Sequence, residues 1–169
     1  MQGHTVWKVI RRAGIAAGVA LLAVWGMGAQ DAPPQPLPFS HKAHAGALKL
    51  QCKMCHANPD PGDAMTIAAT KTCMQCHSAI KKEAPAIQKL AEYAAKEQDV
   101  PWVRVYEVPP FVYFGHRAHL AKNTCDDCHG KVAERDALYK EVTLDMAACI
   151  DCHAGKQAGV GCGFCHDPR

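Results

Sequence analysis

Residues 114 to 130 read Phe-Gly-His-Arg-Ala-His-Leu-Ala-Lys-Asn-Thr-Cys-Asp-Asp-Cys-His-Gly, and this stretch decides how the chain folds. It joins a pair of histidines behind a phenylalanine to a Cys-x-x-Cys-His motif. The spacing of three places His116 and His119 on neighbouring edges of one helical turn, from which two imidazoles reach two different metal centres. The motif is typical of covalent haem attachment, in which the thiols bond the haem and the histidine binds its iron.

The same motif occurs five times and uses all ten cysteines of the chain. The cysteines are Cys52, Cys55, Cys73, Cys76, Cys125, Cys128, Cys149, Cys152, Cys162 and Cys165, and the motif histidines are His56, His77, His129, His153 and His166. A disulfide scaffold would not need a histidine after each pair, and zinc ribbons space their histidines differently. We therefore expect five covalently bound haem c groups, each with a motif histidine as its proximal iron ligand.

An internal duplication organises the motifs. Phe-Ser-His41-Lys-Ala-His44 matches Phe-Gly-His116-Arg-Ala-His119, and the motifs that begin at Cys52 and Cys73 recur in the same order at Cys125 and Cys149. Only the second copy has a third motif, beginning at Cys162. This repeat predicts a two-haem module over residues 39–82 and a three-haem module over residues 114–169.

The remaining segments predict simple connections. Residues 83–113 are predicted to form a helix and an extended connector. The helix covers residues 83–98 with Pro85 in its first turn, and the extended stretch begins at Val100. The aromatic residues of this connector are expected to pack against haem edges and to join the modules. Residues 31–38 are rich in proline and predict an extended tether. The expected fold class is mostly α and irregular, with short helices and loops wrapped around five haems, because so short a chain builds no large core.

Residues 1–30 are expected to direct export, as a signal peptide or an N-terminal membrane anchor. Lys8, Arg11 and Arg12 form a basic region before an uncharged run that ends at Ala29. Basic residues stay on the cytoplasmic side, so the haem modules would lie on the periplasmic side of the cytoplasmic membrane. These three cations account for the formal charge of +3, and the near-neutral remainder indicates no nucleic-acid partner.

Five six-coordinate irons need five axial ligands beyond the motif histidines. Outside the motifs and the export segment the chain has four histidines, His41, His44, His116 and His119. Methionine is the other common axial ligand of electron-transfer haems. Met146 stands three residues before Cys149 and is the first candidate, whereas Met65 stands eight residues before Cys73 and is the second. An open iron is the third possibility.

Residues 114–169 resemble the small class III cytochromes, in which the first histidine of His-x-x-His binds the haem of the next motif and the second binds the last haem of the module. This resemblance implies His116 for the haem of His129 and His119 for the haem of His166. The family has a histidine where this chain has Met146, which leaves Met146 for the haem of His153. The family assigns no iron to His44, and we expect it at the haem of His77.

Over residues 37–166 the pattern resembles the pentahaem cytochrome c subunit of alternative complex III. The resemblance is carried by PFSHKAHAG, CKMCH, TCMQCH, PWVRVYEVPPFVYFGHRAHL, CDDCHG and LDMAACIDCH. It implies an electron-transfer protein rather than an enzyme. Such a subunit collects electrons from a membrane-bound quinol-oxidising complex and passes them to a periplasmic cytochrome or a terminal oxidase.

Two other functions fit the same motifs. One is a multihaem reductase of a small nitrogen or sulfur oxyanion, which needs one iron with an exchangeable sixth position. The other is a structural subunit of a larger assembly, in which the haems stabilise the fold and their redox activity is incidental. The chain is short for an enclosed substrate pocket, and no motif has lysine in place of its histidine. Electron transfer is therefore the favoured interpretation.

We predict that the intact holoprotein exceeds the mass of its polypeptide by five haem groups. Replacing Cys162 and Cys165 together by serine should lower this excess by one haem, because serine forms no thioether bond. Mass spectrometry under denaturing conditions measures both, since it removes any haem that is not covalently bound. An excess below five haems in the unchanged protein would contradict the motif count.

Overall fold

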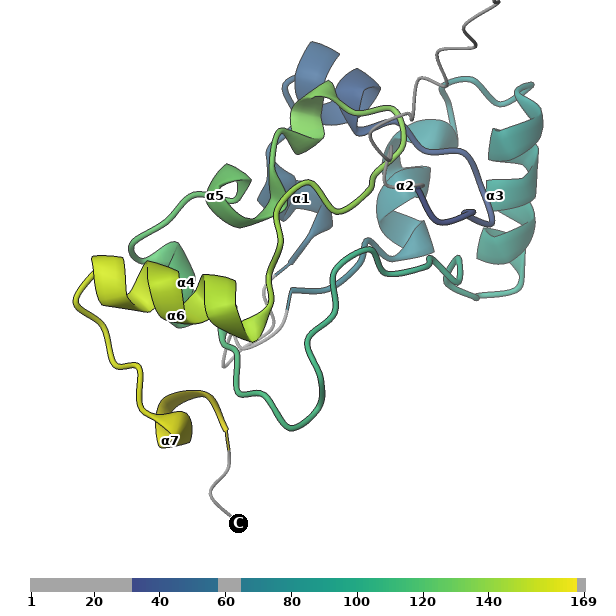
Figure 1. The fold of residues 1–169 in the computed structure, drawn as a ribbon. Helices are drawn as coiled ribbons and strands as arrows, with labels where there is room; N and C mark the ends of the chain where they lie inside the picture. Colours follow the sequence, from purple (N-terminus) through teal and green to yellow (C-terminus); the bar gives the residue numbers. More distant parts are fainter. Residues whose placement is uncertain (1–31, 58–64, 167–169) are drawn as a thin grey trace, which may run out of the picture.

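The structure is a computed structural model that describes residues 32–57 and 65–166 (Figure 1). Its elements are the π-helical turn η1 (Lys42–Ala47), α1 (Cys52–Cys55), α2 (Thr70–His77), α3 (Pro85–Ala95), α4 (His116–Leu120), α5 (Asp126–His129), the 3-10 turn η2 (Val132–Glu134), α6 (Met146–Gly155) and α7 (Cys162–Cys165). Within these ranges, strand pairing is confined to one isolated bridge between Val112 and His166. The expected mostly α and irregular fold is confirmed for this part of the chain.

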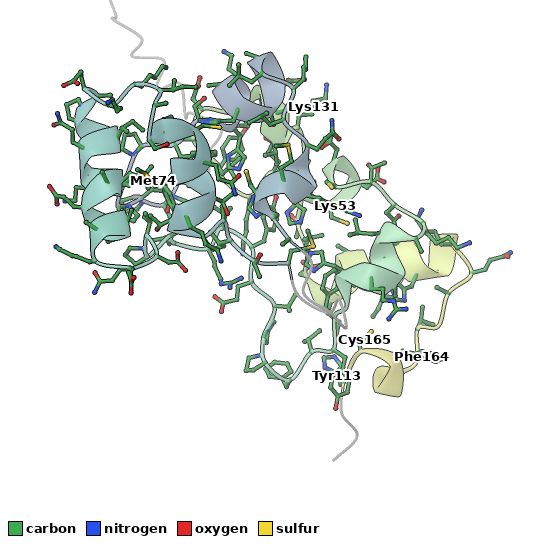
Figure 2. All side chains as sticks on the ribbon, turned by 180° about the vertical axis from the view of Figure 1, so that it is seen from behind. Lys53, Met74, Tyr113, Lys131, Phe164 and Cys165 are labelled. Carbon is green, nitrogen blue, oxygen red and sulfur yellow. The ribbon has the colours of Figure 1, made fainter. Side chains whose placement is uncertain are left out.

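Helices α2 and α3 lie side by side and hold a small apolar core (Figure 1). Leu37, Leu90 and Val100 are each only 5% exposed, and Met74 lies between the two helices (Figure 2). The predicted helix over residues 83–98 is confirmed with narrower bounds. Pro85 occupies its first turn, where the missing N–H costs no hydrogen bond.

The buried Thr70 closes this lobe. Its backbone N–H donates to Asp99 Oδ1 at 2.7 Å, and its Oγ1 accepts from the backbone N–H of Val100 at 3.0 Å. A buried N–H without such a partner costs about 1–3 kcal/mol. These two bonds therefore fix the start of α2 to the chain that leaves α3.

The connector after α3 has no helix and contacts the proline-rich segment. Val103 exchanges two hydrogen bonds of 2.9 Å with the side-chain amide of Gln35. Because Leu37 is also buried, this end of the expected tether packs on the body of the protein. Trp102 packs against the small apolar core, whereas Tyr113 is 58% exposed in the polypeptide. The expected packing of these rings against haem edges stays a prediction.

The two copies of the repeat meet where η1 packs on η2. The N–H of Lys42 donates to the carbonyl of Arg135 at 2.9 Å, and Ser40 Oγ donates to Asp136 Oδ1 at 2.6 Å. A Cβ on Gly46 would collide with the carbonyl oxygen of Ala133. Only glycine permits so close an approach, and the contact joins the copies directly rather than through the connector alone.

None of the helices formed by residues 32–57 and 65–166 is long and apolar enough to cross a membrane. The expected export segment, residues 1–30, lies outside the described residues.

We predict that Leu90→Ala lowers the free energy of unfolding of the holoprotein by about 2–5 kcal/mol, because it leaves a cavity between α2 and α3. Leu48 is 66% exposed and serves as the matched control. Leu48→Ala should change the free energy of unfolding by less than about 0.5 kcal/mol. Denaturant titration followed by far-ultraviolet circular dichroism measures both, and equal effects would contradict the position of the core.

Candidate haem-binding sites

The structure brings eight histidines together as four facing pairs, each with one His-x-x-His member and one motif member. The ring centroids are 6.3 Å apart for His41 and His56, 6.1 Å for His44 and His77, 6.4 Å for His116 and His129, and 6.0 Å for His119 and His153. With a metal–nitrogen bond of about 2 Å and about 1.1 Å from nitrogen to ring centre, two imidazoles on opposite sides of one metal have centres about 6.2 Å apart. The centroid distances of all four pairs match this spacing.

Backbone carbonyls orient the imidazoles. Nδ1 lies 2.8–3.3 Å from a carbonyl oxygen in six cases, His44 to Ser40, His56 to Thr66, His77 to Ile80, His119 to Gly115, His153 to Gly159 and His166 to Phe111. A carbonyl oxygen only accepts, so Nδ1 carries the proton in each of these rings. Nε2 is then left as the unprotonated, metal-binding nitrogen.

A phenylalanine supports each His-x-x-His pair in the same way. The Phe39 ring meets His41 edge-on at 4.8 Å and stacks on His44 at 4.6 Å. In the second copy, Phe114 meets His116 edge-on at 4.9 Å and stacks on His119 at 4.4 Å. The aromatic residue before each pair was a visible sequence signal, but its role between the two imidazoles is evident only in the structure.

Burial keeps two of these imidazoles neutral. Burial, with smaller contributions from His56 and His44, lowers the pKa of His41 to about 4. Burial also lowers the pKa of His129, and the neighbouring imidazoles His116 and His56 lower it further. The neutral ring is the form that binds a metal.

The cysteines among residues 32–57 and 65–166 form neither disulfides nor a zinc-type cluster. All ten are free thiols. In residues 32–57 and 65–166, no three His, Cys, Asp or Glu side chains converge on a common centre of the kind that holds a zinc ion. Large apolar side chains inside the motifs, such as Met54 and Phe164, are 60% and 70% exposed on the polypeptide. A flat apolar group attached at the motif thiols fits against them.

The structure contradicts the assignment of His119 to the haem of His166 and of Met146 to the haem of His153. His119 instead faces His153 at 6.0 Å, in the same way as His44 faces His77. The internal repeat predicts the same pairing, because His119 and His153 in the second copy correspond to His44 and His77 in the first. The class III pattern gave a different partner for His119. In this chain the second histidine of each His-x-x-His pair faces the histidine of the second motif in its own copy, not the histidine of the last motif.

His166 is the motif histidine left over, because the other eight histidines among residues 32–57 and 65–166 form the four pairs. Its ring lies 5.9 Å from that of Phe111. Met146 begins α6, one turn before Cys149, and is 67% exposed, whereas Met65 is partly buried before α2. A methionine ligand therefore remains a prediction, now for the haem of His166.

A polar cluster behind His129 escaped the sequence interpretation. The Tyr106 ring lies edge-on to His129 at 4.8 Å, and its hydroxyl accepts from the N–H groups of Glu141 and Val142 at 2.9 and 3.1 Å. The Glu141 carboxylate pairs with Arg135, which lowers the pKa of that carboxyl. Gly130 has φ of 72°, and a Cβ there would collide with the Glu141 side chain. The glycine after Cys-Asp-Asp-Cys-His was the available signal.

Comparisons with known proteins match both halves of the chain to cytochrome families. Residues 27–100 match the family described as class III cytochrome C, and residues 112–167 match the family described as cytochrome c7 and related cytochrome c. The multihaem cytochrome c subunit of a menaquinone reductase from Nitratidesulfovibrio vulgaris is 29% identical over 160 residues, covering 78% of this chain and 76% of the relative. A cytochrome c3 from Desulfuromonas acetoxidans is 36% identical over 55 residues, covering 32% of this chain and 79% of the relative.

These matches confirm the resemblance to class III multihaem cytochromes, and the cofactor common to such families is covalently bound haem c. The facing imidazole pairs and the ten free thiols fit that group.

We predict that His119→Ala leaves the haem of His153 without its second axial ligand and produces a high-spin ferric signal in low-temperature EPR. The same substitution in a variant that lacks Cys149 and Cys152, and therefore this haem, should produce no new high-spin signal. A high-spin signal that persists in the combined variant would mean that His119 is the axial ligand of the haem of His166.

Proposed function

We propose that this multihaem cytochrome c carries five haem c groups and relays single electrons between a membrane complex that reacts with quinones and a periplasmic redox partner. The observation that carries the proposal is the set of four imidazole pairs with ring centroids 6.0–6.4 Å apart. Two protein ligands on one iron leave no position for a substrate, whereas they hold the coordination steady while its charge changes.

The ring-to-ring distances support an assignment of the residues that would hold each group. The thiols of each motif would carry the thioether bonds, and His41 with His56, His44 with His77, His116 with His129 and His119 with His153 would supply the axial pairs. When bound, haem c supplies an iron that accepts and releases one electron. The Nδ1 hydrogen bonds make the imidazoles more basic and fix the planes of their rings.

The fifth motif decides between this function and its main alternative. His166 has no facing histidine among residues 32–57 and 65–166, and we assign its second position to Met146. A thioether ligand raises the potential relative to bis-histidine ligation and would make this the high-potential member of the set. If that position is open instead, the motif becomes the site at which a small nitrogen or sulfur oxyanion could be reduced.

The partner and compartment are also part of the proposal. The relative from N. vulgaris is by name a subunit of a menaquinone reductase, which supports a quinone-reactive membrane complex as the partner. The resemblance to alternative complex III supports a quinol-oxidising complex that delivers electrons to a periplasmic cytochrome or a terminal oxidase. The basic and uncharged runs within residues 1–30 support a position on the periplasmic side of the cytoplasmic membrane.

We predict that the oxidised holoprotein shows four bis-histidine signals by EPR and one His–Met charge-transfer band by near-infrared magnetic circular dichroism. Met146→Ala should abolish the band. Met54, which is 60% exposed, provides the control, and Met54→Ala should leave the band unchanged. A high-spin ferric signal in the unchanged protein that responds to nitrite would contradict the closed fifth site and favour the reductase.

The relay itself is tested with membranes of the producing organism from which this protein has been washed. A menaquinol analogue should reduce the added holoprotein only when the membranes are present. In the reverse experiment, reduced holoprotein should be reoxidised by menaquinone, again only with the membranes. The faster of the two gives the physiological direction. Rapid reoxidation of the reduced holoprotein by nitrite or sulfite without membranes would instead support catalysis.

A further inference from the structure

We propose that the five haem groups form one unbranched line in the order of the motif histidines His77, His56, His129, His153 and His166, with the two modules joined between His56 and His129. This order differs from the order of the motifs along the chain. It rests on the proposed function, because it requires every motif to carry a haem.

The two neighbours within each module follow from the shared His-x-x-His turn. His41 and His44 both contact the Phe39 ring, within 4.8 Å between centroids, and they face His56 and His77. The thiol of Cys55 accordingly lies near that of Cys76. One helical turn therefore supplies an axial ligand to each of two adjacent irons.

The second copy repeats this arrangement. His116 and His119 both contact the Phe114 ring and face His129 and His153. The thiol of Cys128 lies near those of Cys152 and Cys149. The haems of His129 and His153 are therefore neighbours, as are those of His56 and His77.

The link between the copies lies at α1 and α5. The thiol of Cys125 lies near that of Cys52, and the imidazole of His56 is close enough to that of His129 to affect it electrostatically. The backbone bond from Lys42 to Arg135 joins the turns η1 and η2, which lie beside α1 and α5 in the chain. Cys52 and Cys125 are the first cysteines of their motifs, so the macrocycle edges that they carry meet there.

The last link joins α6 to α7, because the thiol of Cys149 lies near that of Cys165. Beyond it, α7 is held by the connector, where the N–H of Tyr113 donates to the carbonyl of Cys165 at 2.7 Å (Figure 2). The helices α2, α1, α5, α6 and α7 follow one another across the molecule in this order (Figure 1). The groups of His77 and His166 are thus the two ends, where electrons enter and leave.

The order is tested by raising the potential of one haem and observing which others respond. Histidine-to-methionine substitutions keep the iron six-coordinate and raise its potential. During a redox titration followed by NMR of the haem methyl groups, each newly reduced iron lowers the potential of its nearest neighbours. His44→Met raises the potential of the His77 haem itself, and among the other four haems it should shift the midpoint of the His56 haem alone. His116→Met raises the potential of the His129 haem and should shift the midpoints of the His56 and His153 haems about equally.

A shift at the haem of His129 or His166 after His44→Met would overturn the order. So would a shift of the His77 haem as large as that of the His56 haem after His116→Met. Intact mass spectrometry separates this failure from failure of the proposed function. Five covalent haems with a different neighbour pattern overturn the order alone, whereas fewer than five overturn the relay from which the order was inferred.

The junction has its own test with matched glycine variants. Gly46→Ala places a methyl group against the Ala133 carbonyl and should push η2 away from η1, whereas nothing lies within 4 Å of the corresponding position in Gly155→Ala. The milder Asp136→Asn weakens the bond from Ser40 without a steric clash. Gly46→Ala and Asp136→Asn should slow electron exchange between the modules several-fold after flash reduction, and Gly155→Ala should leave it unchanged. Equal rates of electron exchange in all three variants would show that the modules do not exchange electrons across the contact of η1 with η2.

Discussion

The rest of the structure depends on two imidazoles that face each other across the space of one iron. One comes from a Cys-x-x-Cys-His motif and the other from a helical turn that precedes it in the chain. The two partners are nearest in sequence for His116 and His129 and farthest apart for His119 and His153. Each pair therefore closes a loop of the backbone. A metal bound by both rings would add its binding free energy to folding, as in other small metal-dependent domains.

This dependence explains how a chain with so small a core is organised. Three buried apolar side chains between α2, α3 and the connector cannot offset the conformational entropy of the described residues. The C-terminal half has no buried apolar cluster among its described residues. A side-chain cap, from Asp145, is present on α6, and the Tyr106, Glu141 and Arg135 network lies behind His129. Groups bound at the motifs would add to its stability and would link cofactor loading to folding.

Sequence and structure disagreed where a family pattern was transferred against the chain's own repeat. The His-x-x-His turns, their phenylalanines and the helix beginning at Pro85 were all predictable, because local spacing and proline geometry determine them. The partner of His119 was not, because His153 and His166 are both motif histidines downstream and local rules do not distinguish them. The η1 contact with η2 and the cluster behind His129 were equally hidden, since they join segments that lie far apart in the chain.

The sequence by itself determined the cofactor chemistry. Ten cysteines in five Cys-x-x-Cys-His motifs and two His-x-x-His turns predict which residues would bond and ligate, because thioether and axial chemistry depend on residue type and short spacing. Only the tertiary structure decided which histidine meets which motif and in what order the motifs succeed one another in space. That order depends on the packing of η1 against η2 and on the approach of Cys125 to Cys52 and of Cys149 to Cys165, which brings together residues that lie apart in the chain.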